Sequence, residues 1–132
     1  MSNDVLLVGK PGPLSNALIN LIESVPTAHA VFQAETGLLA LKMMRVIRVR
    51  LVVIASSIAD DETTELVSQI QAHFATICLV IANTPQQIEH ARQIGAQVSV
   101  LSTISATELK RVIQQQLTTV PQSVQEISEC PN

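Results

Sequence analysis

The 132-residue chain has the length of one ordinary domain. Hydrophobic residues make up 47% of it and charged residues 14%, a balance that excludes disorder of the whole chain. The net charge of −3 and the near absence of aromatic side chains, with Phe32 and Phe74 alone, argue against general polyanion binding and against base stacking. We therefore expect no direct nucleic-acid binding by this domain.

Membrane insertion and secretion are not expected either. No apolar run reaches the roughly 18 residues of a membrane span, and the polar start Met1–Asp4 does not resemble a signal peptide. Cys78 lies in an apolar run and Cys130 in a polar segment, so a disulfide would tie a core strand to a loose end. We expect two free thiols and a cytoplasmic protein.

In the first half of the chain, apolar runs alternate with helix-length segments. Val5–Val8 predicts a strand, and the Gly- and Pro-rich segment 9–13 predicts a loop. An amphipathic helix should follow and end at Pro26, and residues near 30–34 predict a second, weaker strand. The apolar stripe of this helix would comprise Leu14, Leu18, Leu21, Ile22 and Val25.

The segment 36–47 predicts a second helix that is apolar almost all round. Its polar stripe consists only of Lys42, Arg45 and Arg48. One buried stripe does not need so many aliphatic side chains. The excess either packs under the neighbouring helix or forms an interface.

The second half of the chain continues the alternation. Three further strands are predicted at about 51–55, 76–82 and 98–101. Helices are predicted at about 63–74 and 85–94, and a last helix should begin after Ser105. Gly95 would end the fourth helix, Ser105 with Glu108 would form a capping box, and the last buried stripe would comprise Leu109, Val112, Ile113 and Leu117.

Five strands alternating with five helices predict a three-layer α/β domain with right-handed crossovers. In such sheets, ligands and chemistry lie beyond the carboxyl ends of the strands. The third strand ends here in Ala55-Ser56-Ser57, a methyl group and two hydroxyls. We expect residues 1–117 to form the domain and residues 118–132 to form a polar, mobile tail.

The order and spacing of these elements over residues 4–117 resemble the receiver (CheY-like) domain of two-component response regulators. The likeness rests on the runs Val5–Val8 and Arg50–Ile54, on the Gly95-Ala96 turn before the fifth strand, and on the helix start Ala106–Leu109. These are hydrophobic and turn features. They imply a flavodoxin-like (βα)5 fold with a parallel sheet of order 2-1-3-4-5.

The same resemblance implies functional side chains that this sequence lacks. A working receiver has two acidic Mg²⁺ ligands after the first strand and a phosphate-accepting Asp after the third. It also has a Ser or Thr after the fourth strand, an aromatic switch residue in the fifth, and a Lys after the fifth. The residues at these positions are Gly9 and Lys10, Ala55, Ala82, Ser99 and Ser102. Thr84 is a weak substitute at the fourth strand, because the loop is about two residues short.

These departures remove the chemistry. Phosphoryl transfer to a carboxylate needs the carboxylate and a metal ion that offsets negative charge, and Mg²⁺ is held by oxygen ligands. Lys10 would instead place a positive charge in the vacated metal position, or point into solvent. We expect no enzymatic activity, no metal and no cofactor.

Other apparent motifs have simpler interpretations. The segment 9–12 lacks the spacing of a phosphate loop, and Ser56-Ser57 lacks the glycines of a nucleophile elbow. The run Asp60-Asp61-Glu62 suits the positive end of a helix dipole. The three histidines, His29, His73 and His90, show no metal-ligand spacing.

Two surfaces are candidates for protein contacts. Lys42, Arg45, Arg48 and Arg50 supply four of the eight cations, as a solvated face or as a docking patch for an acidic partner. The resemblance implies a second surface, for a partner or a homodimer, formed by the fourth helix, fifth strand and fifth helix. Its residues would be Gln86, Gln87, Glu89, His90, Gln93, Lys110, Arg111 and Gln114.

The sequence thus predicts a pseudo-receiver, a signalling domain that cannot be phosphorylated and that acts through protein–protein contacts. Three alternatives remain. The chain is the N-terminal regulatory domain of a longer protein, such as a transcription regulator or a pilus-localisation ATPase. It senses a small ligand at the neutral strand ends. Or it is an enzyme with an unusual active site.

Overall fold

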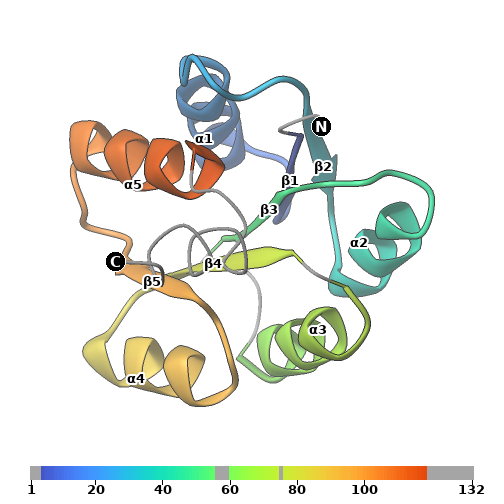
Figure 1. The fold of residues 1–132 in the computed structure, drawn as a ribbon. Helices are drawn as coiled ribbons and strands as arrows, with labels where there is room; N and C mark the ends of the chain where they lie inside the picture. Colours follow the sequence, from blue (N-terminus) through green and yellow to red (C-terminus); the bar gives the residue numbers. More distant parts are fainter. Residues whose placement is uncertain (1–3, 56–59, 75, 119–132) are drawn as a thin grey trace, which may run out of the picture.

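The computed structural model describes residues 4–55, 60–74 and 76–118, drawn in colour in Figure 1. Strands and helices alternate without exception along these segments. They are β1 (Val5–Val8), α1 (Pro13–Glu23), β2 (Val31–Ala34), α2 (Gly37–Met44), β3 (Leu51–Ile54), α3 (Asp60–His73), β4 (Ile77–Ala82), α4 (Pro85–Gln93), β5 (Val98–Leu101) and α5 (Ala106–Thr118).

The five strands form one parallel sheet in the order β2-β1-β3-β4-β5, which confirms the predicted topology. Helices α1 and α5 cover one face of the sheet, and α2, α3 and α4 cover the other (Figure 1). Because every strand points the same way, all carboxyl ends lie at one edge of the sheet, which we call the carboxyl edge. The opposite edge is called the amino edge.

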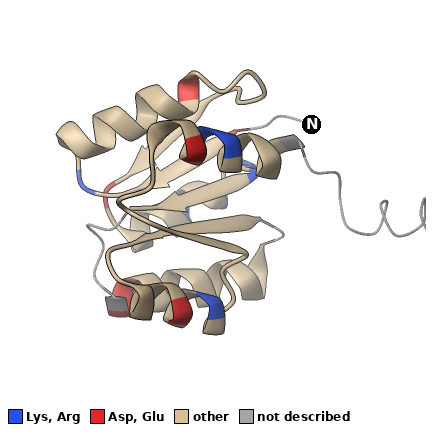
Figure 2. Cartoon of the chain, turned by 90° about the vertical axis from the view of Figure 1, so that its left-hand side faces the viewer, with Lys and Arg blue, Asp and Glu red and all other residues tan. Residues whose placement is uncertain are grey.

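Alternate strand residues build two separate cores. In β1, Leu6 and Val8 face the α2–α3–α4 side, whereas Val5 and Leu7 face the α1–α5 side. The register aligns Leu6 with Val52 and places Cys78 next in the same row. All residues of β1 and β3 are buried, as continuous aliphatic strands covered on both faces must be. Charged residues lie on helices and connecting segments, and no strand contains one (Figure 2).

Three predictions about the helices were wrong in detail. Helix α2 ends at Met44, before the β-branched Val46 and Ile47, which lie in the connection to β3. Helix α3 already begins at Asp60, since acidic residues are favourable within a first helical turn. Leu14 is 55% exposed, because it lies in the first turn of α1 at the mouth of a cavity.

The predicted cap at Ser105 is present, and Thr36 supplies another cap that was not predicted from the sequence. Oγ1 of Thr36 accepts from N of Leu39 at 3.1 Å, and Oγ of Ser105 accepts from N of Glu108 at 3.2 Å. Gly95 has φ +107°, a left-handed conformation that a side chain would strain, and an added Cβ would lie 3.3 Å from Cγ of Gln71. Gly95 therefore ends α4 as the sequence predicted.

Some predictions fall outside the described residues, namely the polar tail from 119 onward and the free thiol of Cys130. Cys78 is a free, buried cysteine. Within the segments that the structure describes, no helix has both the length and the apolar character needed to cross a bilayer.

Candidate functional site

The carboxyl edge of the sheet, where a receiver would carry its chemistry, is built from small neutral residues. Gly9 follows β1 and is buried, and Ala55 follows β3 with 2% of its surface exposed. Ala82, the last residue of β4, is 3% exposed. None of these three side chains can act as a nucleophile or as a metal ligand.

The polar groups near the ends of β4 and β5 bond to one another. Oγ of Ser102 donates to Oδ1 of Asn83 at 3.0 Å, and N of Ser102 donates to O of Ala82 at 2.7 Å. N of Asn83 donates to Oε1 of Gln87 at 2.8 Å, and Oγ1 of Thr84 caps α4 by accepting from N of Gln87 at 3.2 Å. The hydroxyl groups of Thr84 and Ser102 therefore form local hydrogen bonds in the segments that follow β4 and β5.

The backbone carbonyl groups that follow β1 likewise accept hydrogen bonds from within the protein. Nε2 of Gln33 donates to O of Gly9 at 3.3 Å, and Oγ of Ser15 donates to O of Lys10 at 2.5 Å. Lys10 itself is exposed. Because Lys10 is exposed, the structure favours the interpretation in which its ammonium group points into solvent over the one in which it occupies the metal position.

The acidic run 60–62 has a capping role that differs from the predicted one. Oε2 of Glu62 accepts from N of Gly37 at 2.7 Å, so this carboxylate satisfies the amino end of α2, a different helix from its own. Oδ1 of Asp61 accepts from N of Glu62 at 2.9 Å. Among the described residues, no three His, Cys, Asp or Glu side chains are grouped as metal ligands would be.

The predicted partner surface on α4, β5 and α5 is only partly continuous. Gln86, Gln93, Arg111 and Gln114 are exposed, and Lys110 is half-buried. Glu89 forms an exposed ion pair with Arg92 at 3.8 Å, which contributes little to stability. Gln87 is engaged at Asn83, as described above.

His90 points away from that surface. Its Nε2 lies 2.8 Å from Oγ1 of Thr64 on α3, so His90 links α4 to α3 and not to α5. The pair is exposed. His29 is exposed in the segment before β2, and His73 ends α3, so the three histidines are not brought together.

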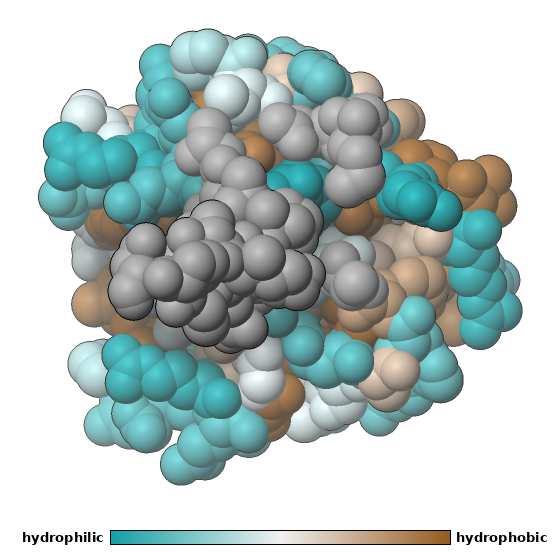
Figure 3. Space-filling model, in the orientation of Figure 1, coloured by the Kyte–Doolittle hydropathy of each residue, from teal (hydrophilic) through white to brown (hydrophobic). Residues whose placement is uncertain are grey.

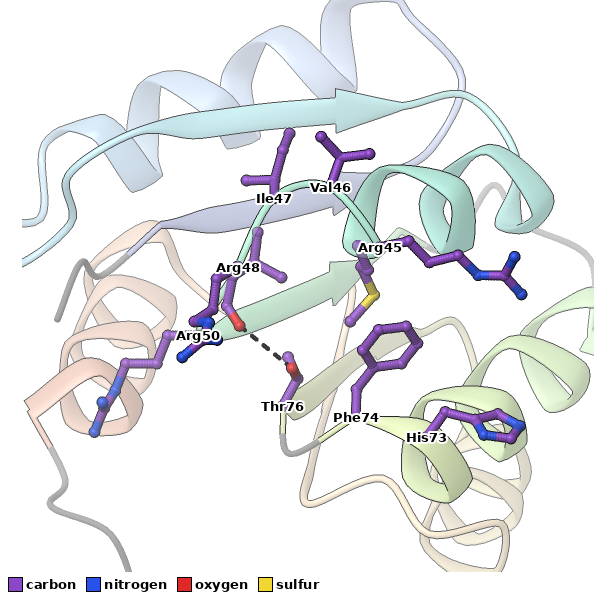
Figure 4. A pocket seen from close by; sticks show the side chains of 10 residues that line it. Arg45, Val46, Ile47, Arg48, Arg50, His73, Phe74 and Thr76 are labelled. Carbon is purple, nitrogen blue, oxygen red and sulfur yellow. Dashed lines mark hydrogen bonds between the residues drawn. The ribbon is translucent and has the colours of Figure 1, made fainter.

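The cationic residues of segment 42–50 separate into two groups. Arg45, Arg48 and Arg50 line a cavity of about 650 Å³ at the amino edge, whereas Lys42 is not in its wall. The polar and aromatic part of the wall is completed by His73, the last residue of α3, and by Phe74 and Thr76 in the connection to β4 (Figure 4). The sequence analysis missed this contribution, because the two segments lie more than 20 residues apart and share no motif.

Helix α2 exposes part of its excess aliphatic surface. Leu38 is 66% exposed and Leu39 is also exposed, while Leu41 and Met43 pack against the core. Val46, in the connection from α2 to β3, is exposed as well. Figure 3 shows hydrophobic surface on the side of the molecule where α2 lies. Part of the excess therefore packs against the core, and the alternative of an interface stays a prediction for the exposed side chains.

A second cavity, of about 460 Å³, lies between α1 and the start of α5. Its wall is mainly apolar and includes Leu14, Leu18, Leu21, Ile104 and Leu109. Ser102 and Asn20 supply polar atoms.

Burial also changes the pKa of Cys78, the single cysteine among the residues that the structure describes. Burial raises the pKa of Cys78 to about 11, and a hydrogen bond from Nε2 of Gln71 at 3.6 Å opposes the rise. Because the thiolate is the reactive form, Cys78 is an inert core residue at neutral pH.

Comparison with known proteins supports the fold and leaves activity open. Neither a protein-family model nor a curated protein sequence matches the chain. Among solved structures, the receiver domain of a putative Luxo repressor protein from Vibrio parahaemolyticus is 19% identical, with a TM-score of 0.78 over 98% of both chains.

Two further structures are similar. The signal receiver domain of an HD domain-containing protein from Pseudomonas fluorescens is 20% identical, with a TM-score of 0.76 over 89% of this chain and 95% of that one. The receiver domain of a signal transduction histidine kinase from Syntrophus aciditrophicus is 13% identical, with a TM-score of 0.77 over 92% and 94%. The chain has the fold of a response-regulator receiver domain.

Proposed function

We propose that this chain is a pseudo-receiver, a domain that keeps the receiver fold, does not accept a phosphoryl group and acts through protein–protein contacts. The observation that carries the proposal is the composition of the carboxyl edge. Gly9, Ala55 and Ala82 are buried there without a reactive side chain. A fold with this edge is a scaffold for contacts rather than for phosphoryl transfer.

The residues after β1 do not fit the Mg²⁺ ion of an active receiver. Gly9 has no side chain, and the exposed Lys10 offers no oxygen ligand, whereas a divalent metal needs oxygen ligands. At the end of β3, Ala55 offers a methyl group where phosphoryl transfer needs a carboxylate nucleophile. We therefore assign no phosphoryl-transfer step to this edge.

Incubation with acetyl phosphate and Mg²⁺, followed by intact-mass measurement, tests the first half of the proposal. We expect no phosphoryl adduct, because neither the nucleophile nor the metal ligands are present. A receiver domain with an intact acidic set serves as the positive control. An adduct on the natural chain would contradict the proposal.

A matched pair of variants sharpens the same experiment. Lys10→Asp with Ala55→Asp introduces carboxylates after β1 and β3, whereas Lys10→Asn with Ala55→Asn introduces side chains of the same shape without charge. Circular dichroism would first establish that both variants fold. An adduct on the aspartate variant alone would assign the missing activity to these two positions.

The contact surface is proposed to lie on α4, β5 and α5. Exposed Gln86, Gln93, Arg111 and Gln114 give it the polar character of a reversible interface. His90 is left out of this surface, because it bonds to α3. A homodimer is the simplest assembly that the surface would support.

Light scattering after size-exclusion chromatography tests the homodimer. We expect the mass to rise above that of a monomer with concentration, and Arg111→Glu to reverse the rise. Glu23→Lys, at the exposed end of α1, is the matched control. A strict monomer at high concentration would count against homodimerisation.

A second candidate function is regulation within a longer protein. The similar structures from Pseudomonas fluorescens and Syntrophus aciditrophicus are receiver domains of an HD domain-containing protein and of a histidine kinase. The gene sequence beyond codon 132 distinguishes this candidate from a single-domain protein.

A further inference from the structure

The cavity at the amino edge combines cations with an apolar wall. It lies between the connection from α2 to β3 and the connection from α3 to β4. Its lining residues are Met44, Arg45, Val46, Ile47, Arg48, Val49, Arg50, His73, Phe74 and Thr76. Three of them are arginines and none is acidic.

This concentration of positive charge runs against the charge of the whole chain. The chain has 8 Lys and Arg residues against 11 Asp and Glu, yet three of those 8 cations line one cavity. A hollow lined by one sign of charge raises the local concentration of oppositely charged ligands. Guanidinium groups are planar donors that match carboxylate and phosphate oxygens.

The apolar part of the wall belongs to the core and is therefore held in place. Met44 and Val49 are buried, and Ile47 and Phe74 pack against the same core cluster. Oγ1 of Thr76 donates to O of Val49 at 3.3 Å and ties the two connections together (Figure 4). A wall anchored in this way is formed before any ligand arrives.

The side chains are distributed around the cavity so that charge flanks the aromatic ring. In the view of Figure 4, Phe74 lies between Arg48 and Arg50 on one side and Arg45 and His73 on the other. An inorganic anion would use only the cationic groups and leave the ring uncovered. A molecule with an apolar body and an acidic group would use both.

We propose that this cavity is a binding site for a small amphiphilic organic anion, in which the arginines hold a carboxylate, phosphate or sulfonate and Phe74 covers an apolar body. The volume of about 650 Å³ suits a small organic ligand. The site lies at the opposite edge of the sheet from the strand ends where receiver chemistry would lie. It does not depend on the proposed pseudo-receiver function.

Fluorescence titration with 1-anilinonaphthalene-8-sulfonate, an aromatic sulfonate, tests the site on the full folded chain. We expect saturable binding that Arg48→Glu weakens about tenfold or more, since it reverses a cation in the wall. Arg45→Glu is a second variant in case the first does not fold. Lys10→Glu, which reverses an exposed cation at the carboxyl edge, is the matched control and should change the dissociation constant by less than about twofold.

Two further measurements distinguish this site from purely hydrophobic dye binding and from binding in the apolar cavity. The neutral analogue N-phenyl-1-naphthylamine should bind the natural chain more weakly, because it lacks the acidic group. In amide NMR spectra, the sulfonate should shift residues 44–50 and 73–76 rather than the apolar cavity near Leu14 and Leu109. Equal weakening by Arg48→Glu and Lys10→Glu, equal binding of the neutral analogue, or shifts confined to α1 and α5 would overturn the proposal.

Discussion

The two edges of the sheet differ in kind, although the same strands end at both. At the carboxyl edge, Gly9, Ala55 and Ala82 are buried and uncharged, and Ser102 and Asn83 bond to each other. At the amino edge, three arginines and a histidine line one cavity together with Phe74. Arginine side chains are therefore grouped at the edge where the receiver fold does not place its chemistry.

This difference shows that the sheet does not dictate where a protein places its polar groups. The strands contain no charged residue, and β1 and β3 are buried along their whole length, so each edge is set by the connecting segments. One fold can therefore carry different polar groups at its two edges. Substitutions at each edge and in the strand between them test this comparison, beginning with the largest expected effect.

Ala82→Asp should destabilise the domain most. The substitution buries a carboxylate at a position that is 3% exposed, which costs about 3 kcal/mol or more in the free energy of unfolding. Urea denaturation measures the change. Burial favours the protonated carboxyl and raises its pKa above the unfolded value, so the loss of stability should shrink as the pH falls toward about 4 and change no further below it.

Two controls accompany this substitution. Ala82→Asn has the same shape without a charge and should be less destabilising. Ser102→Asp lies at the exposed end of the neighbouring strand and should be nearly neutral. Stability of Ala82→Asp equal to the natural chain would mean that the carboxyl edge still accommodates an acid.

The second-largest effect is expected for Cys78, which lies inside the sheet between the two edges. Its pKa is raised from 9.0 to about 11, so the folded state holds the proton more tightly than the unfolded state. The contribution of the Cys78 thiol to the free energy of unfolding is complete below pH 9 and is lost as the pH rises toward 11. In a Cys130→Ser background, the free energy of unfolding should fall by about 2 kcal/mol more across this range than in Cys78→Ala.

The same thiol gives a kinetic readout. In the Cys130→Ser background at pH 8, a disulfide reagent should modify Cys78 only when the domain opens, because the side chain has no exposed surface. Adding low concentrations of urea should accelerate the modification. Rapid labelling under native conditions would show that the sheet interior is open to solvent.

Thr76→Val should have a smaller effect at the amino edge. It removes the bond from Oγ1 to O of Val49 and should cost about 1 kcal/mol, measured by urea denaturation. Thr76→Ser keeps the hydroxyl and should recover most of the loss. If both variants match the natural chain, the bond does not hold the two connections together.

Ser102→Ala should have the smallest effect. The bond from Ser102 to Asn83 is exposed at the carboxyl edge, so we expect a change of about 0.5 kcal/mol or less in the same assay. Asn83→Ala should give a similar value, because each variant removes one partner of the same bond. A loss well above that of Thr76→Val would reverse the expected order of the two edges.

The elements were predictable where the local pattern decides the structure. The strands Val5–Val8 and Val98–Leu101 follow from aliphatic runs, and the cap at Ser105 follows from the residues next to it in the sequence. The ends of α2 and the start of α3 were less predictable, because tertiary packing and capping decide them. Glu62 illustrates the point, since its carboxylate reaches the amino end of a different helix.

The sequence by itself predicted the strand order through its resemblance to receiver domains, and it determined that the residues after the strands include Gly9, Ala55 and Ser102. Only the tertiary structure decided which residues from other segments line the cavity together with the arginines. His73 and Phe74 meet Arg45, Arg48 and Arg50 because parallel strands bring the segments before β3 and β4 to one edge. The tertiary structure also decided that His90 contacts Thr64 on α3. Contacts between distant segments follow from the packing of the sheet and helices, which no local pattern encodes.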